Sequence, residues 1–402
     1  MPLSGGKTNN TQRNYCSAKS LWAIRGLYFF NFAAVGVFFT FINVYYKSIG
    51  LTGTQIGLIN TVGPLIGVFS TTLWGMLSDR LGKTRLLVAI AAFGIVSSAL
   101  ALSAADTFLW ILIAAGSLAL FNSALVPLVD STAMSVLGEH RERYGSLRVW
   151  GSVGFILTSS TIGFLFERMG MHILFFVYAG VMGLLLLTSL WMPEQPVHLG
   201  GGSLLRGMNQ MIRQPRWMLF ATCVFLLWIA TSGTMAFVSI VIKGMGGSDQ
   251  LIGLSWSVAA LFELPVMFFS GALLRRFGAA RLLFLAFGVY IPRITLYGLM
   301  PLPEWVIPIN ALHALTFVPF WVSAVNYAAE LAPPNLKATA QGMFFSVMNL
   351  AGMTSGVLSG WLFDTVGSRG LFLTLAGFCA AAFALFTYGQ WTFRRWDAEG
   401  GR

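Results

Sequence analysis

Apolar residues fill most of the chain in long runs that short polar segments separate. Each run approaches or exceeds the roughly 20 residues that an α-helix needs to cross the hydrocarbon core of a bilayer. The runs are rich in Leu, Phe, Ala and Gly and lack period-two alternation, which favours helices over the strands of a membrane barrel. The pattern predicts about twelve spans, at approximately 21–46, 54–77, 86–105, 109–130, 148–166, 172–192, 217–241, 251–274, 281–300, 305–328, 338–362 and 370–392.

Basic residues are concentrated in every second polar segment. One set of segments carries Lys7, Arg13, Lys19, Arg80, Lys83, Arg85, Arg141, Arg143, Arg206, Arg213, Arg216, Arg275, Arg276, Arg281, Lys337, Arg394 and Arg395. The opposite loops hold Lys47, Arg168, Lys243 and Arg369. The positive-inside rule therefore predicts that both termini are cytoplasmic, which requires an even number of spans.

Composition agrees with a lipid-solvated protein. Of 402 residues, 56% are hydrophobic and 10% are charged, against about 25% charged in soluble domains. The net charge of +11 could indicate a nucleic-acid partner, but its alternation between loops makes it a signal of topology. We expect a multi-pass protein of the cell membrane, inner or plasma, with no nucleic-acid partner, no cofactor and no metal.

The polar segments also suggest how the chain is divided. The first residues lack the apolar region and cleavage site of a signal peptide. The segment near the middle of the chain is rich in Pro, Gly and Arg, as linkers often are. We expect a disordered cytoplasmic tail over 1–20, a six-helix half over 21–192, a cytoplasmic linker over 193–216, a second six-helix half over 217–392 and a cytoplasmic tail over 393–402.

Two internal matches at nearly one offset indicate a duplication. Residues 75–87 and 271–283 share seven identical positions at an offset of 196. Residues 163–175 and 360–372 share six, and Glu167 corresponds to Asp364, at an offset of 197. The chain is predicted to be all-α, with one six-helix unit used twice in parallel, an arrangement that puts a substrate site between the halves near the midplane.

The loop after the second predicted helix carries a specific motif. Residues 75–85 read GMLSDRLGKTR. The motif resembles the signature loop of the major facilitator superfamily, apart from Thr84 at one basic position. The resemblance implies a gating role for Gly75, Asp79, Arg80, Gly82, Lys83 and Arg85, in which Asp79 pairs with a helix N-terminus or basic groups and holds one state of the transport cycle. Alternatively, Asp79 and Arg80 merely cap helices and fix topology.

Few ionisable groups lie within the predicted spans, where each costs at least about 2.5–3.5 kcal/mol on insertion scales. Such residues are functional candidates by default. They are Arg25, Asp130, Arg148, Glu263, Arg293 and His313.

Asp130 and Arg148 stand in the sequences VPLVDS and YGSLRVWGS. This hairpin resembles that of the 3-phenylpropionate and lactose permease-like branch, in which an acidic residue and an Arg face each other across the cavity. A salt bridge at the cytoplasmic boundary is the alternative. In the second half, Glu263, Arg293 and His313 resemble the branch's acidic residue of helix 8, Arg of helix 9 and His of helix 10.

The departures from the lactose permease matter for the substrate. The Glu that follows its His by three residues is Thr316 here, and the Lys three residues before is Asn310. Its sugar-stacking Trp is Phe155, and its helix 7 Asp has no counterpart in 217–241. Recognition of a lactose-like sugar is therefore disfavoured.

The sequence predicts a secondary transporter that works by alternating access, as a proton-coupled symporter. The arginines could hold a carboxylate bidentately, which favours an organic or aromatic acid. Asp130, Arg148, Glu263, Arg293 and His313 are the main candidates for substrate binding or proton coupling; Arg25, Phe155, Trp256, Asn310 and Thr316 are secondary. A sugar or nucleoside symporter, a drug exporter and a non-transporting receptor or scaffold are alternatives. We expect a monomer, and no enzymatic or Walker A motif is found.

Overall fold

The computed structural model describes the chain except residues 1–17, 139, 141–142, 195–210, 334–335 and 399–402. The described part is helical. Its elements are α2 (Ala18–Ser48), α3 (Gly53–Leu81), α4 (Thr84–Ser103), α5 (Phe108–Leu137), α6 (Tyr144–Met169), η2 (Met171–Ile173), α7 (Leu174–Ser189), α9 (Pro215–Gly244), α10 (Asp249–Phe277), α11 (Ala279–Leu299), η3 (Pro303–Trp305), α12 (Val306–Ala311), α13 (His313–Leu331) and α14 (Lys337–Ala398).

Ten of the described helices are long and apolar enough to cross a membrane, and a bent pair makes an eleventh span. The longest span, Thr339–Phe393, holds two helices that meet at Gly367, where φ is 71°. The expected twelve spans are thus accounted for, and the all-α membrane fold is confirmed. Most helices extend beyond the apolar runs, because helical hydrogen bonding can continue into the interfacial region.

The bent span places a polar residue at its break. Pro303–Ala311 and His313–Leu331 meet at an angle of 41°. The amide of Leu315 donates to the carbonyl of Leu312, a tighter turn than the α-helical one. His313 therefore begins α13 at the break in the span.

Glycines with positive φ recur at the offset of the internal repeat. Gly50 and Gly246 have φ of 89° and 88°, and Gly82 and Gly278 have φ of 61° and 75°. Gly170 and Gly367, at 86° and 71°, form a third pair. The duplicated sequence thus forms duplicated turns at equivalent places.

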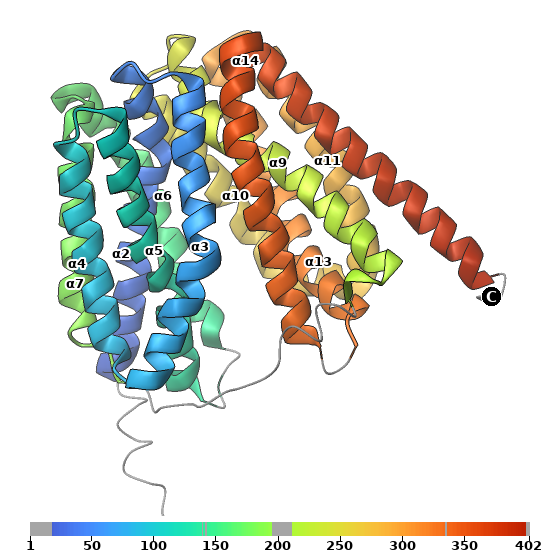
Figure 1. The fold of residues 1–402 in the computed structure, drawn as a ribbon, viewed down its shortest axis with the longest axis horizontal. Coiled ribbons are helices and arrows are strands. Elements are labelled where there is room, and N and C mark those ends of the chain that lie inside the picture. Colours follow the sequence, from blue (N-terminus) through green and yellow to red (C-terminus); the bar gives the residue numbers. More distant parts are fainter. Residues whose placement is uncertain (1–17, 139, 141–142, 195–210, 334–335, 399–402) are drawn as a thin grey trace, which may run out of the picture. The chain divides into compact units, whose positions relative to one another are not determined.

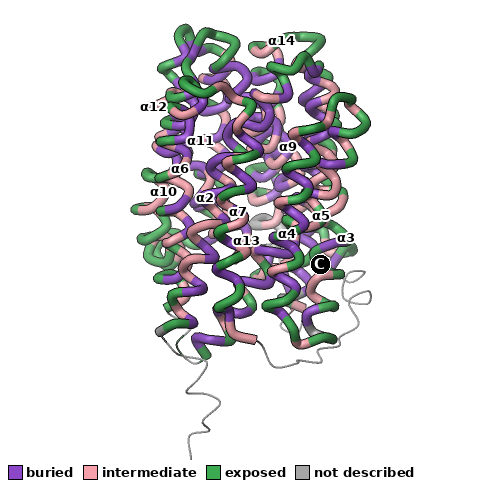
Figure 2. Tube along the Cα trace, turned by 90° about the vertical axis from the view of Figure 1, so that its left-hand side faces the viewer, coloured by how far each residue is buried: buried purple, intermediate pink, exposed green. Residues whose placement is uncertain are grey.

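The described helices contribute to two compact units. In the first unit, which comprises Met1–Phe38, Phe69–Ser159 and His172–Gly200, α4 packs against α5 and α7 (Figure 1). In the second, which comprises Phe39–Val68, Ser160–Met171 and Gly201–Arg402, α14 packs against α9 and α11, and α13 against α10 and α11. Buried and exposed residues alternate along the helices (Figure 2), and many exposed ones are large and apolar.

The predicted division into tails, halves and linker stays a prediction. The N-terminal tail and most of the linker lie outside the described residues. At the other end, α14 continues to Ala398, so the first residues of the segment predicted as a cytoplasmic tail are helical.

Candidate functional site

Asp130 is held by two tyrosine hydroxyls in the first unit. Tyr28 of α2 donates to its Oδ1 at 2.5 Å, and Tyr144 of α6 donates to the same oxygen at 3.0 Å. Hydrogen bonds to an ionised acceptor are shorter and stronger than neutral ones. The half-buried carboxylate of α5 is thus connected to α2 and α6.

Arg148 lies over aromatic rings instead of pairing with that carboxylate. Its guanidinium carbon is 4.2 Å from the ring centroid of Phe32 and 5.3 Å from that of Tyr28. Cation–π contacts of this length are attractive. Within the described residues no ion pair joins Asp130 to Arg148, so Tyr28 is the link between the two predicted partners.

Glu263 and His313 form a pair in the second unit. His313 Nε2 lies 2.8 Å from Glu263 Oε1, with the imidazole 5% exposed and the carboxylate 24% exposed. Where Glu263 is ionised, Nε2 donates to it, so Nδ1 of the neutral imidazole is an acceptor. The sequence predicted both residues, and the fold of α10 and α13 brings them into contact.

Arg293 of α11 is buried among neutral groups. It donates to Thr316 Oγ1 at 2.9 Å and to the hydroxyl of Tyr297 at 3.1 Å. Tyr297 donates to Asn310 Oδ1, and Asn310 donates to the carbonyl of Ser255 at 2.9 Å. This chain of bonds connects the guanidinium to α10, α12 and α13 and fixes its position.

Three polar atoms around this cluster have no hydrogen-bond partner, one of them the hydroxyl of Tyr290. Arg293 Nε and His313 Nδ1 are buried without a hydrogen bond. Both residues, with Trp256, Tyr290 and Tyr297, line a cavity of about 10 Å³, which is about the space of one water. Among the described residues Arg293 also forms no ion pair within 4 Å.

The secondary candidates are dispersed. Arg25 is half-buried, with its guanidinium carbon 4.8 Å from the ring centroid of Trp22 and its Nε unpartnered. Trp256 donates to Ser239 Oγ at 3.1 Å and meets Phe39 edge to face. Phe155 is half-buried and its carbonyl accepts from Ser159 Oγ at 2.6 Å. Asn310 and Thr316 belong to the Arg293 cluster.

The signature loop forms the expected turn. Gly82 has a φ of 61° between α3 and α4, and Ser78 and Thr84 share a hydrogen bond of 2.9 Å across it. Arg85 lies 3.4 Å from Glu194. The side chain of Asp79 lies outside the described part of the chain, so the gating role of Gly75, Asp79, Arg80, Gly82, Lys83 and Arg85 stays a prediction.

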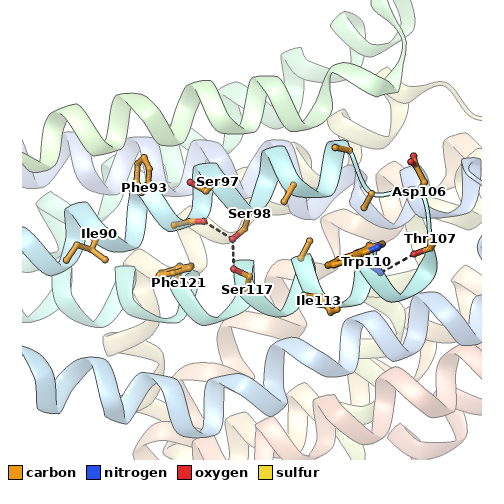
Figure 3. A pocket seen from close by; sticks show the side chains of 15 residues that line it. Ile90, Phe93, Ser97, Ser98, Asp106, Thr107, Trp110, Ile113, Ser117 and Phe121 are labelled. Atoms are coloured by element: carbon orange, nitrogen blue, oxygen red, sulfur yellow. Dashed lines mark hydrogen bonds between the residues drawn. The ribbon is translucent and has the colours of Figure 1, made fainter.

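A larger cavity, of about 880 Å³, lies between α4 and α5 (Figure 3). Its walls include the exposed side chains of Phe93, Trp110 and Ile113. The hydroxyls of Ser98 and Ser117 bond to each other at 2.8 Å. An open apolar groove on a membrane helix pair suits lipid chains rather than a polar solute.

Four tyrosines in these clusters were not sequence candidates: Tyr28, Tyr144, Tyr290 and Tyr297. Tyr297 follows Arg293 by four residues and Tyr144 precedes Arg148 by four, a spacing that puts each pair on one helix face. That spacing could have identified both. Tyr28 lies far from Asp130 in sequence, and no local signal indicates it.

Comparison of the sequence with known proteins identifies a transporter family. The model of the "MFS_1 like family" matches residues 21–374. The chain is 26% identical over 358 residues to the maltose permease of Geobacillus stearothermophilus, covering 87% of this chain and 89% of that one. It is 28% identical over 369 residues to the "Probable 3-phenylpropionic acid transporter" of Escherichia coli, covering 88% and 94%.

The fold also matches a solved structure. A mutant of the nucleoside transporter NupG superposes with a TM-score of 0.85, covering 92% of this chain and 99% of that one at 18% identity. Those names cover a sugar, an acid and nucleosides, so they identify a class of protein and not a substrate. The chain belongs to the MFS_1-like family and is a multi-pass membrane transporter of the major facilitator type, not an enzyme.

Proposed function

We propose that the protein is a proton-coupled symporter of a small organic acid, with an aromatic acid as the best candidate. The observation that carries the proposal is that Arg293 is buried without an ion-pair partner among the described residues. Its side chain is buried, its partners Thr316 and Tyr297 are neutral, and its Nε is unpartnered. A buried cation without a counter-charge is costly, and a substrate carboxylate would remove that cost.

The surroundings of Arg293 support an aromatic substrate. Trp256, Tyr290 and Tyr297 line the same small cavity. Apolar and aromatic walls with a few convergent polar groups are typical of small-molecule sites. The cavity would have to widen to admit a ring, as expected for one state of an alternating-access cycle.

The pair formed by Glu263 and His313 supports proton coupling. His313 contacts Glu263 through Nε2, while its unpartnered Nδ1 is buried beside the cavity that Arg293 lines. Ionisable pairs inside membrane helices are common parts of proton pathways. We infer that protonation of this pair accompanies the binding of the acid at Arg293.

Asp130 and Arg148 are proposed as the counterpart in the first unit. Arg148 is free of ion pairs among the described residues and is held against Phe32 and Tyr28. A second arginine with aromatic neighbours suits the same substrate class. The proposal also includes cytoplasmic termini, a location in the cell membrane and a monomeric state.

Transport in proteoliposomes with an imposed pH gradient tests the proposal. The panel would contain labelled aromatic carboxylates, maltose and uridine. Uptake of a carboxylate should exceed that of the neutral solutes and should collapse when the gradient is dissipated. Arg293→Gln should reduce that uptake roughly ten- to hundredfold, as for loss of a hydrogen bond to a charged group, whereas the exposed Arg276→Gln should not.

Three other results would contradict the proposal. Preferred uptake of maltose or uridine would favour a sugar or nucleoside symporter. Extrusion that consumes the gradient would favour a drug exporter. A protein that binds an acid, as a thermal shift would show, but moves no solute would favour a receptor or scaffold.

A further inference from the structure

Two helices of the second unit begin with equivalent caps. At the start of α3, Thr52 Oγ1 accepts from the amide of Gln55 at 3.2 Å, and Gln55 Oε1 accepts from the amide of Thr52 at 3.0 Å. At the start of α10, Ser248 Oγ accepts from the amide of Leu251 at 3.0 Å. These local caps leave the first amides of each helix without a partner in their own segment.

In each case a carboxylate from another helix accepts hydrogen bonds from those amides. Asp364 of α14 accepts from the amides of Gly53 and Thr54, each at 2.7 Å, and from Thr54 Oγ1 at 2.7 Å. Glu167 of α6 accepts from the amide of Gln250, in the first turn of α10, at 3.0 Å. Negative charge is favoured at a helix N-terminus, so both contacts are electrostatically attractive.

The two contacts are related by the internal repeat. Thr52 corresponds to Ser248 at an offset of 196, and Glu167 corresponds to Asp364 at 197. Each carboxylate belongs to one predicted six-helix half and caps a helix of the other half. The exchange is therefore reciprocal: α14 caps α3, and α6 caps α10.

Glycines one turn before each carboxylate bring the backbones together. A Cβ placed on Gly360 would lie 2.4 Å from the carbonyl oxygen of Gly53. A Cβ placed on Gly163 would lie 2.3 Å from that of Asp249. The carboxylates reach the amides of the neighbouring helix because the glycines let the two helix backbones approach closely.

We propose that Asp364 and Glu167 are latches that hold the transporter closed at the end where α3 and α10 begin. The inference rests on the alternating-access function proposed above. When one half rocks against the other, contacts between the halves at one end must break. Opening would return the amides of Gly53, Thr54 and Gln250 to water and leave the carboxylates without their donors.

The latches are unequal. Asp364 accepts three hydrogen bonds, whereas Glu167 accepts one from Gln250. Lys47 lies near the first latch, with its ammonium 5.5 Å from the ring centroid of Phe363. We therefore expect Asp364 to control opening more strongly than Glu167.

Distances between spin labels in the full-length protein in nanodiscs test the proposal. One label pair replaces the exposed Ser48 and Arg369, and a second replaces the exposed Met169 and Met245. Asp364→Asn keeps the side-chain volume but removes the charge. It should increase the open-to-closed ratio at the Ser48–Arg369 pair about tenfold, and Thr54→Val should produce a smaller increase. Glu167→Gln should increase the open-to-closed ratio at the Met169–Met245 pair by less than Asp364→Asn increases it at the Ser48–Arg369 pair.

Asp249→Asn is the matched control. Asp249 is a carboxylate in the first turn of α10, but it pairs with Lys243 of the adjoining helix at 2.7 Å and links no separate halves. Asp249→Asn should leave both distance distributions unchanged. Thr54→Ser, which keeps the hydroxyl that Thr54→Val removes, should show the wild-type distribution at the Ser48–Arg369 pair.

The outcomes separate this inference from the proposed function. A distance shift in Asp364→Asn supports the latch even if no tested solute is transported. Wild-type distances in Asp364→Asn, with transport intact or with only a lower melting temperature, would show that the carboxylate is a static cap and would overturn the latch. An equal shift in Asp249→Asn would also overturn it, because loss of any local charge would then suffice.

Discussion

His313 Nε2, at the first residue of α13, lies 2.8 Å from Glu263 Oε1 of α10. The two residues are 50 positions apart and come from different spans. The contact gives α10 and α13 a shared, protonatable link beside the buried guanidinium of Arg293. Because both the imidazole and the carboxylate can bind a proton, this contact is the first place to test proton coupling.

We expect Glu263→Gln to remove the dependence of acid uptake on the pH gradient while solute exchange continues. The amide can still accept a hydrogen bond from His313 but cannot be protonated in the physiological range. Gradient-driven accumulation should fall roughly ten- to hundredfold. Equilibrium exchange across proteoliposomes should stay within about twofold of wild type if only coupling is lost.

Glu304→Gln, in the exposed turn before α12, is the control and should keep full accumulation. Retention of the gradient dependence in Glu263→Gln would exclude this carboxylate as the coupling group.

Tyr297→Phe should weaken acid binding by roughly two- to tenfold, since one neutral hydrogen bond contributes about 0.5–1.5 kcal/mol. The change removes the hydroxyl that links Arg293 to Asn310 and leaves the guanidinium less fixed. Isothermal titration would measure the affinity. The exposed Tyr388→Phe provides the comparison and should bind as wild type does. An unchanged affinity in Tyr297→Phe would mean that the packing of Arg293 alone fixes its position.

Tyr28→Phe should lower the free energy of unfolding by about 1–3 kcal/mol, because Asp130 loses one of its two tyrosine donors within a membrane helix bundle. The ring contact with Arg148 would survive, since phenylalanine retains the aromatic face. Thermal unfolding in detergent, with Tyr144→Phe and the double variant, would measure the coupling between the two donors. Equal stability of all four proteins would show that water replaces the hydroxyls without loss.

Two glycines in α3 should respond in opposite ways to alanine. A Cβ on Gly57 would lie 2.1 Å from the carbonyl oxygen of Gly356, so Gly57→Ala must push the backbones of α3 and α14 apart. Gly67 has open space around the corresponding position, and alanine there should stabilise the helix by up to about 1 kcal/mol. A lower melting temperature for Gly57→Ala and an equal or higher one for Gly67→Ala are expected. The reverse order would contradict the close approach of these backbones.

The sequence by itself determined the membrane class, the spans and the duplication. These features depend on short-range properties: about 20 apolar residues make a span, and a turn with positive φ needs glycine wherever it recurs. The pairs Gly50/Gly246, Gly82/Gly278 and Gly170/Gly367 show that the repeat in sequence is also a repeat in backbone geometry.

Only the tertiary structure decided which polar groups meet. In lipid, both the packed and the exposed helix faces are apolar, so hydrophobic periodicity cannot say where Asp130 or Arg148 points. Asp130 bonds to Tyr28 and Tyr144, neither of which was a sequence candidate. Asp364, which the sequence offered merely as half of a repeated pair, reaches the N-terminus of a helix more than 300 residues away. Such contacts depend on how helices pack, and no local property of the chain specifies them.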